Sequence, residues 1–461
     1  MKNKTVYITY LLFIQFILYA SCSNYEVKEI QAITLNTEEL TLQTGGSQQL
    51  EIVNNAQVTT VWYSDNTEVV TVSRTGLITA INEGVATITA DIGSAKAVCK
   101  VLVIGTSSVF NLDLLKTPLS EQLIYSANTK LIAPYRVMQG FDIDSSGNIY
   151  FIQIGAYSGG TPGSTKAHES YIIKTTPNSN DVSNYMTFKY FGHGSNLAIE
   201  ETNQGDTYVW LNSNATKNLT SFEYEDSKTI SRIKYEPGKT YEEGYAGETF
   251  YLGDEFKNTH PAIDVKNRRL TIPASQNRLR HFFTYDLDDA MNLSEKEISL
   301  ELTYGGELVG ETPVTETRKI QVKDLRELIP LGYFKIPVGY NKDKDINSHS
   351  MQGFDVQGNF IYFNEGDGNQ NIIKNGHSND YVTNLDLNGN MIKNRIAVYV
   401  IIELDVLNKL SITDTGYMEG EGLKIIDNKL YLGFASRRNP SAPGGDDYRR
   451  ANIFVYDSAI L

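Results

Sequence analysis

Polar side chains recur at the starts of similar alternating segments in the long C-terminal region of the chain. Three of the six histidines stand at such starts, and the full set is Gln139, His193, His260, His349, Gln352, Glu419 and Glu421. If these segments are inner strands of a propeller, their starts meet at one mouth of its central channel. The sequence therefore predicts a ligand-binding ring. The alternative is that these side chains hydrogen-bond neighbouring segments and only lock the ring together.

Catalysis at the same place would require a pair of carboxylates. A glycosidase holds two acids across the scissile bond, and the weak candidates are Glu200, Glu365, Glu419 and Glu421. Their separation does not follow from the sequence, so catalytic activity is left open. The histidines lack the close spacing of common metal sites, so neither a metal nor another cofactor is expected.

Two neighbouring arginines are candidates for contact with an anionic ligand. Arg437 and Arg438 follow the string Gly-Phe-Ala-Ser at 433–436. A guanidinium pairs with carboxylate or phosphate groups through two parallel hydrogen bonds. We predict both side chains to be ligand-binding.

The N-terminus has the order of an export signal. Lys2 and Lys4 precede an apolar run, and the string Leu-Tyr-Ala-Ser-Cys at 18–22 resembles a bacterial lipobox. The resemblance implies removal of residues 1–21 and a lipid on Cys22, with 22–29 as an anchor linker. The predicted location is the cell envelope, anchored to the membrane through that lipid; the outer membrane, the periplasm and the cell surface all remain possible. The alternative is an ordinary secreted protein.

Charge and cysteine content exclude other classes. The chain has 461 residues with 41 basic and 55 acidic side chains, a net charge of −14, so we expect no nucleic-acid partner. Two cysteines, one of them the predicted lipid carrier, leave no intramolecular disulfide. Cys99 lies in an alternating segment and is expected in a core.

Residues 30–104 are predicted to form a small antiparallel β-sandwich. Short alternating runs are separated by turns, and Trp62 is expected to fill the core. The strings Val-Ser-Arg-Thr-Gly-Leu-Ile-Thr-Ala (72–80) and Glu-Gly-Val-Ala-Thr-Ile-Thr-Ala (83–90) resemble the group 2 bacterial Ig-like domain. The resemblance implies a spacer, and residues 105–125 are predicted to be a linker.

Residues 126–461 repeat one hairpin. Met-Gln-Gly-Phe-Asp occurs at 138–142 and at 351–355, each time before an aromatic strand. Weaker copies lie at 196–211, 261–272 and 421–432. Five copies predict a five-bladed propeller, with the charged insertion 304–348 as a solvated loop; six blades are the alternative.

Two strings in this region carry a second resemblance. They are Gly-His-Gly-Ser-Asn-Leu-Ala-Ile-Glu at 192–200 and Glu-Gly-Glu-Gly-Leu at 419–423. They resemble the β-propeller shared by staphylococcal phage receptor-binding proteins and teichoic acid biosynthesis protein C. The resemblance implies recognition of a cell-envelope glycopolymer.

The sequence thus predicts an all-β chain in which an Ig-like sandwich precedes a propeller. The predicted function is non-catalytic recognition of a bacterial surface polysaccharide or glycopolymer. A polysaccharide-degrading enzyme, either a glycoside hydrolase or a lyase, is the first alternative, and a protein-binding surface scaffold is the second. A fold of this type does not by itself decide among them.

Overall fold

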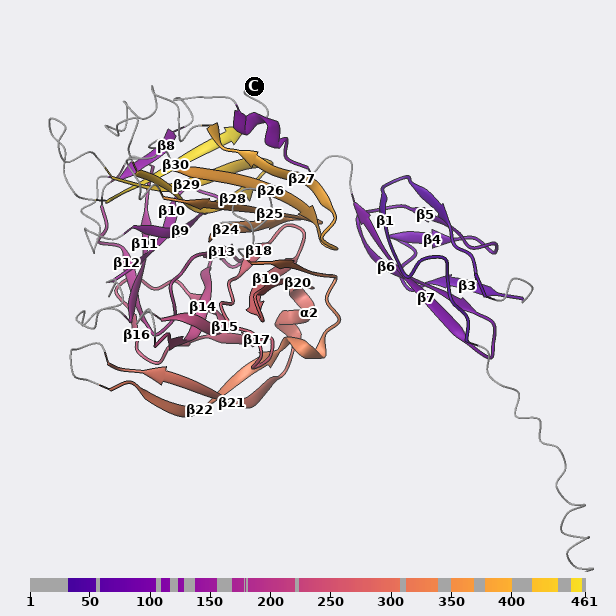
Figure 1. Cartoon of the computed structure of the whole chain (residues 1–461), viewed down its shortest axis with the longest axis horizontal. Coiled ribbons are helices and arrows are strands. Elements are labelled where there is room, and N and C mark those ends of the chain that lie inside the picture. Colours follow the sequence, from indigo (N-terminus) through magenta and orange to yellow (C-terminus); the bar gives the residue numbers. More distant parts are fainter. Residues whose placement is uncertain are drawn as a thin grey trace, which may run out of the picture. The chain divides into compact units, whose positions relative to one another are not determined.

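The computed structural model divides the chain into two units, Met1–Thr106 and Ser107–Leu461, and each is described by itself (Figure 1). The described residues are 32–54, 59–104, 109–116, 123–127, 137–155, 168–177, 179, 181–219, 224–306, 312–338, 350–368, 378–399, 417–437 and 449–457.

The first unit is a sandwich of two sheets. One sheet has the order β1-β7-β6-β3, with β1 parallel to β7, and the other has the order β2-β5-β4. The strands are β1 (Glu39–Gln43), β2 (Ser47–Gln49), β3 (Val61–Ser64), β4 (Val70–Val72), β5 (Leu77–Ala80), β6 (Gly84–Asp91) and β7 (Lys96–Ile104). The predicted Ig-like sandwich is confirmed.

Apolar side chains of alternate positions fill this sandwich. Val70, Ile78 and Ile88 are buried, and Cys99 is a free, buried cysteine among them. Burial raises the pKa of the Cys99 thiol to about 11, so the group is an unreactive core side chain, as predicted. Trp62 is partly buried and packs against the same core.

The described part of the second unit contains five sheets. The first sheet consists of β9 (Met138–Ile143), β10 (Ile149–Ile154), β11 (Glu169–Thr175), β12 (Tyr185–Lys189) and β16 (Thr240–Tyr241). The second consists of β13 (Ala198–Glu201), β14 (Thr207–Lys217), β15 (Tyr224–Lys234), β17 (Glu248–Tyr251), β22 (Val314–Asp324) and β21 (Glu295–Tyr304). The third is β18 (Ala262–Asp264), β19 (Arg269–Gln276), β20 (Leu279–Asp286) and β23 (Gly332–Pro337). The fourth consists of β24 (Ser350–Gln357), β25 (Phe360–Asp367), β26 (Asn379–Asp386) and β27 (Met391–Ala397). The fifth consists of β28 (Tyr417–Ile426), β29 (Lys429–Arg437), β30 (Arg449–Asp457) and β8 (Leu123–Ala127).

The first strands of these sheets form the centre of a propeller. Each one contacts the next in the cyclic order β9, β13, β18, β24, β28 and back to β9. Figure 1 shows these five strands gathered in the middle of the unit. Each of the five sequence repeats supplies the first two strands of one sheet. The predicted propeller architecture is therefore confirmed, and the sheet of β28 takes its fourth strand, β8, from the start of the unit.

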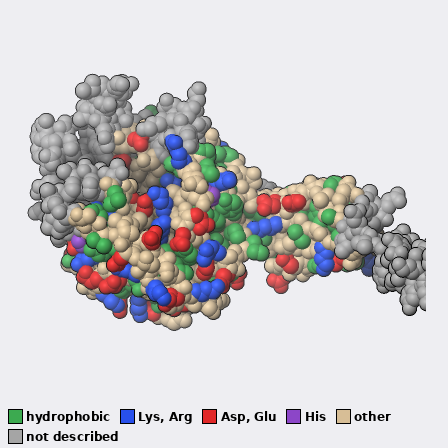
Figure 2. Space-filling view, turned by 60° about the horizontal axis from the view of Figure 1, so that its bottom comes forward, with side chains coloured by type: hydrophobic (Ala, Val, Ile, Leu, Met, Phe, Trp, Pro, Cys, Tyr) green, Lys and Arg blue, Asp and Glu red, His purple; other side chains and the backbone are tan. Residues whose placement is uncertain are grey.

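The charged insertion 304–348 does not form a solvated loop over its described part. Residues 314–324 form β22 and residues 332–337 form β23, and both strands extend sheets that the repeats begin. The prediction of a loop was wrong because alternating charged and apolar residues, as in Lys319-Ile320-Gln321-Val322, also suit a strand with one solvated face. Ion pairs such as Lys319 with Glu297 (2.7 Å) lie on that face, and Figure 2 shows basic and acidic side chains interspersed there.

Short helices cap the sheets within the described residues. α2 (Leu287–Asn292) begins at Asp286, whose carboxylate accepts hydrogen bonds from the backbone of Asp288 and Asp289. η3 (Leu325–Glu327) follows β22. η1 (Leu112–Lys116) lies within the predicted linker 105–125, contacts β27 and buries Leu112 and Leu115. Part of that segment therefore packs on the propeller.

Glycine in the repeated Met-Gln-Gly-Phe-Asp string permits the inner strands to approach closely. A Cβ atom on Gly353 would lie 2.6 Å from the Cα atom of Gly422 and from the backbone nitrogen of Leu423. Gly422 occupies the equivalent position in its own repeat, and a Cβ there would meet the Phe141 ring at 2.8 Å. Five first strands around one axis leave no room for larger side chains at these points.

Aspartate in the same string connects neighbouring sheets. The Asp142 carboxylate accepts a hydrogen bond from the backbone N–H of Ile199 at 2.8 Å, and Asp355 accepts one from Ile425 at 2.8 Å. Asp264 accepts one from Gly358 at 2.6 Å. Each bond joins the first strand of one sheet to the next sheet, so the repeated aspartate is a structural link.

Lys424 stands where the β28 repeat would have this aspartate. Its side chain is 1% exposed, and its Nζ atom lies 3.7 Å from Asp355 Oδ1. Burial raises the pKa of Asp355 to about 7; the Lys424 charge opposes that shift and the Asp142 charge adds to it. Burial likewise raises the pKa of Asp142, again opposed by Lys424. The buried ammonium group of Lys424 therefore interacts electrostatically with Asp355 and Asp142, which belong to the two neighbouring sheets.

The first prediction concerns the glycine. Gly353→Ala should destabilise the propeller by about 3 kcal/mol, because the new Cβ atom meets backbone that cannot rotate away. Gly205→Ala is the matched control: that glycine has a φ of +83° and open space around its Cβ position, so only the left-handed backbone costs about 1 kcal/mol. Differential scanning calorimetry of both variants measures the difference, and equal losses would refute the close-approach explanation.

The second prediction concerns pH. Between about pH 4, the ordinary aspartate pKa, and pH 7, folded Asp355 holds a proton that the unfolded chain has released, so its contribution makes the free energy of unfolding fall as pH rises. Asp355→Asn should remove up to about 1.4 kcal/mol per pH unit of that slope.

Urea unfolding followed by the fluorescence of buried Trp210, in a Trp62→Phe background, measures this slope. Only the difference between the two chains is diagnostic, because buried histidines titrate in the same range with the opposite sign. Parallel pH curves for wild type and variant would contradict the assignment.

Candidate functional site

The candidate site lies at the side of the propeller where the first strands begin, which we call the start rim. The connections from second to third strands also meet there, because neighbouring strands within the repeats are antiparallel. The opposite side, where the first strands end, is the end rim. Most of the residues predicted from the sequence lie at the start rim.

Three predicted ligand-binding residues occupy the same structural position. The pairing of first and second strands shifts register around Gln139, Gln352 and Glu421, so each lies in a β-bulge at the start of a first strand. A bulge turns a side chain out of the regular alternation, and bulges are frequent beside binding sites. Within the described residues, the Gln139 amide has no hydrogen-bond partner, although the residue is only 8% exposed.

Hydrogen bonds join the bulges of β24 and β28. The Gln352 amide donates to the Gly366 carbonyl oxygen at 3.0 Å and to Glu419 Oε1 at 3.2 Å. Gly420 approaches the same place: a Cβ atom there would lie 2.9 Å from Asp380 Oδ1. Gln352 and Glu419 therefore belong to one polar group that spans two sheets.

Asp380 is a buried acid of this group. Its carboxylate accepts hydrogen bonds from the Asn364 amide at 3.2 and 3.3 Å. Burial raises the pKa of Asp380 well above its usual value, and the charges of Glu365 and Glu419 add to that effect. Asp380 therefore holds a proton more readily than an ordinary carboxyl group does.

Glu365 has a cation beside it. Its Oε1 atom lies 2.9 Å from Arg395 Nε, and both side chains are almost fully buried. The Arg395 guanidinium also lies over the Tyr381 ring, 4.5 Å from its centroid. The positive charge of Arg395 thus neutralises the Glu365 carboxylate.

Two histidines and an arginine form a neighbouring group. Burial lowers the pKa of His260 to about 3, and the charge of Arg280 and that of His193 lower it further. Burial also lowers the pKa of His193, opposed by Glu225. Since both imidazoles are neutral at pH 7, they can donate and accept hydrogen bonds there. Nδ1 of His260 has no partner among the described residues.

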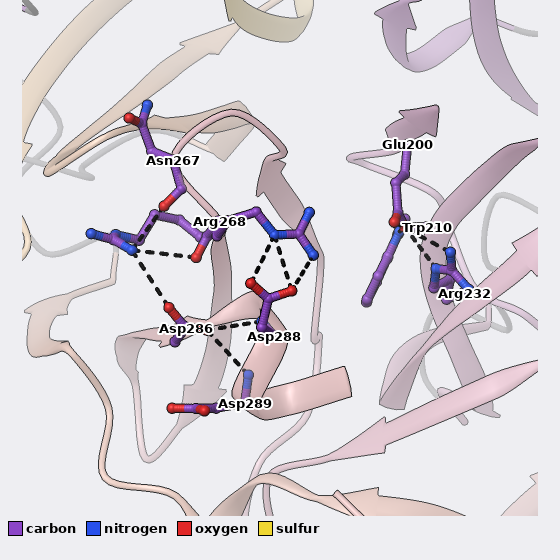
Figure 3. Close-up of polar contacts among 9 residues, drawn as sticks. Glu200, Trp210, Arg232, Asn267, Arg268, Asp286, Asp288 and Asp289 are labelled. Carbon is purple, nitrogen blue, oxygen red and sulfur yellow. Dashed lines mark hydrogen bonds and ion pairs between the residues drawn. The ribbon is translucent and has the colours of Figure 1, made fainter. Parts of the chain in front are cut away.

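Glu200 does not join these groups. It lies near the end rim, where its carboxylate receives hydrogen bonds from Arg232 Nε (2.6 Å) and Trp210 Nε1 (2.9 Å), as Figure 3 shows. Arg232 also bonds Glu248 at 2.8 Å and stacks on Tyr208. The structure therefore places Glu200 in a buried ion-pair network and away from Glu365 and Glu419.

Some predicted residues lie outside the described part of the chain. Cys22, His349 and Arg438 are among them, and their roles stay predictions. Arg437 is the last residue of β29 at the start rim, and its side chain also lies outside the described atoms.

Sequence reasoning missed three residues of the start rim: Arg280, Asp380 and Arg395. They stand on the third and fourth strands of their sheets, in β20, β26 and β27. The sequence repeats cover only the first two strands of each sheet, so charged residues on the outer strands went unnoticed.

No group of three His, Cys, Asp or Glu side chains in the described part of the chain is arranged to hold a metal ion. No helix in that part of the chain has the length and apolar character to cross a membrane.

The fold and the rim define an all-β chain that joins an Ig-like sandwich to a propeller with a polar mouth. Residues 29–101 match the family model "Bacterial Ig-like domain (group 2)". Residues 137–236 match the model "Phage 5-bladed beta propeller receptor binding platform domain". The predicted resemblances to a group 2 bacterial Ig-like domain and, over residues 137–236, to the propeller of phage receptor-binding proteins are confirmed.

Solved structures show only distant likeness. A family-43 glycoside hydrolase matches with 10% identity over 70% of this chain and 91% of its own, at a TM-score of 0.30. A quinonprotein alcohol dehydrogenase-like protein from Bacteroides thetaiotaomicron matches with 11% identity over 80% and 95%, at 0.23. At such TM-scores these likenesses support no conclusion about function.

Domains 4 and 5 of the S-layer protein SbsC match with 22% identity over 16% of this chain, at a TM-score of 0.14. The chain spans about half of that fragment, 51%. No curated protein sequence matches the chain.

Proposed function

We propose that this protein is a non-catalytic receptor for a bacterial surface polysaccharide or glycopolymer, which it binds at the start rim of the propeller. The match to a receptor-binding platform supports recognition of a surface molecule. The observation that carries the proposal is the polar mouth itself: Gln139, Gln352 and Glu421 project from equivalent bulges at the starts of three sheets. Side-chain amides and carboxylates with fixed positions suit the hydroxyl groups of sugars.

The environments of the candidate catalytic acids favour binding over hydrolysis. A glycosidase needs one carboxylate that is free to act beside one acid that can release its proton. Glu200 is engaged by Arg232 and Trp210, and Glu365 is paired with Arg395. A degrading enzyme on the same scaffold would have to use Glu419 or Glu421 with Asp380, and it is the main competing outcome of the experiment below.

The third prediction tests recognition. The full chain, purified in mild detergent, is titrated with a panel of bacterial envelope polysaccharides, and both binding and released oligosaccharides are recorded. We expect binding without release.

Gln139→Leu should weaken that binding about tenfold, the effect of one lost hydrogen bond, with little change in stability because the amide has no partner among the described residues. Arg268→Gln is the matched control, since Arg268 lies at the end rim in an exposed ion pair with Asp288 (Figure 3). Released oligosaccharide would establish the enzyme instead, and no binding of any polysaccharide would favour a protein partner.

The fourth prediction concerns location. We propose that Cys22 carries a lipid that anchors the chain in the cell envelope, with the Ig-like domain as a spacer. The lipobox-like string at 18–22 supports this proposal. The wild-type chain should then enter the detergent phase in Triton X-114 partitioning, whereas Cys22→Ala should stay in the aqueous phase. Equal partitioning of the two chains would refute lipidation.

A further inference from the structure

An arginine with an accessible but unused guanidinium lies at the start rim. Arg280 is the second residue of β20, which a two-residue turn joins to β19. The turn residues Asn277 and Arg278 have φ values of 50° and 63°, as the tight hairpin turn requires. The hairpin therefore holds Arg280 at a fixed height, opposite Ser275 and Ile336 in the sheet.

The guanidinium of Arg280 has no hydrogen bond or ion pair with any residue in the described part of the chain. It is partly exposed. Burial of its surroundings lowers the pKa of Arg280 to about 10, and the charge of Glu365 only partly opposes that shift. The group stays charged at neutral pH, so five N–H donors are present in a poorly solvated place and have no acceptor among the described residues.

Glu365, whose charge acts on Arg280, and the other acids of the start rim have interactions of their own. Glu365 is paired with Arg395 at 2.9 Å, and Glu419 accepts a hydrogen bond from Gln352 at 3.2 Å. The raised pKa of Asp380 favours its neutral form. None of these three acids accepts a hydrogen bond from Arg280, which leaves its donors available to a ligand.

His260 supplies a second polar group beside Arg280. The residue is 8% exposed, and its Nδ1 atom has no partner among the described residues. The two side chains lie within electrostatic range of each other. An imidazole that stays neutral beside a cation can donate one hydrogen bond without adding a second charge. The pair suits a ligand group with a single negative charge.

We propose that Arg280, with His260 beside it, binds the carboxylate of an acidic polysaccharide, so that the glycan recognised at the start rim contains uronic acids. The planar guanidinium matches the two oxygens of a carboxylate. This inference rests on the proposed glycan recognition and specifies the class of glycan. It also gives a role to a charged side chain at the mouth that has no partner among the described residues.

The fifth prediction tests this site on the full chain in mild detergent by isothermal titration calorimetry. The probes are polygalacturonate, polyglucuronate and alginate, each with its carboxyl-reduced counterpart, and poly(glycerol phosphate) as a phosphodiester polymer. At least one of the three uronate polymers should bind, and its carboxyl-reduced form should bind at least tenfold more weakly. The affinity should fall as sodium chloride is added.

Arg280→Gln should weaken that binding at least tenfold, whereas Arg280→Lys should keep part of it because the charge remains without the fork. Arg268→Gln should leave the affinity unchanged. Since Arg280 has no partner among the described residues, its replacement should hardly change the thermal midpoint, which is measured for each variant.

Each other outcome overturns the inference in a distinguishable way. Binding of neutral but not acidic polysaccharides would refute it and leave glycan recognition standing. Tighter binding of poly(glycerol phosphate) would show that the ligand group at Arg280 is a phosphate and not a carboxylate. Equal affinity of wild type and Arg280→Gln for a uronate polymer would move the site elsewhere, and no binding of any glycan would refute both proposals.

Discussion

The propeller depends on one buried cation at its centre. Lys424 lies between Asp355 of the preceding sheet and Asp142 of the following one, and it is 1% exposed. A buried carboxylate pair without this charge would carry a large desolvation cost, which removal of one partner leaves uncompensated. Because Asp142 belongs to the β9 sheet and Lys424 to the β28 sheet, the same interaction joins the two ends of the cyclic arrangement. It complements the strand β8, which closes the ring at its outer side.

The same short strings serve both structure and site. In Met-Gln-Gly-Phe-Asp, the glycine allows the inner strands to approach, the phenylalanine fills the space between sheets, and the aspartate bonds the next strand. The glutamine lies in the bulge at the start rim. Thus, in each string, the glycine after the bulge is required for packing, whereas the glutamine in the bulge is available to a ligand.

Polar side chains of the two rims differ in the partners that the described residues give them. Near the end rim, Glu200 and Arg232 satisfy each other with Trp210 and Glu248, and Arg268 pairs with Asp288. At the start rim, the described polar atoms include donors and acceptors without partners, on Gln139, His260 and Arg280. Buried polar groups are normally hydrogen-bonded. These three groups at the start rim are the physical reason for placing recognition there.

The sequence by itself determined the class of each domain, because alternation, turn residues and a repeated hairpin are local patterns that survive without knowledge of contacts. It also predicted that Gln139, Gln352, Glu419 and Glu421 would share one rim, since equivalent positions of a repeat must be equivalent in space. Only the tertiary structure decided which charges are used by the fold. Glu200 and Glu365 look alike in the sequence, yet their partners Arg232 and Arg395 come from strands whose pairing no local pattern reveals. Arg280 could not be singled out from the sequence for the same reason. That it has no partner among the described residues depends on residues far apart in the chain that pack around it.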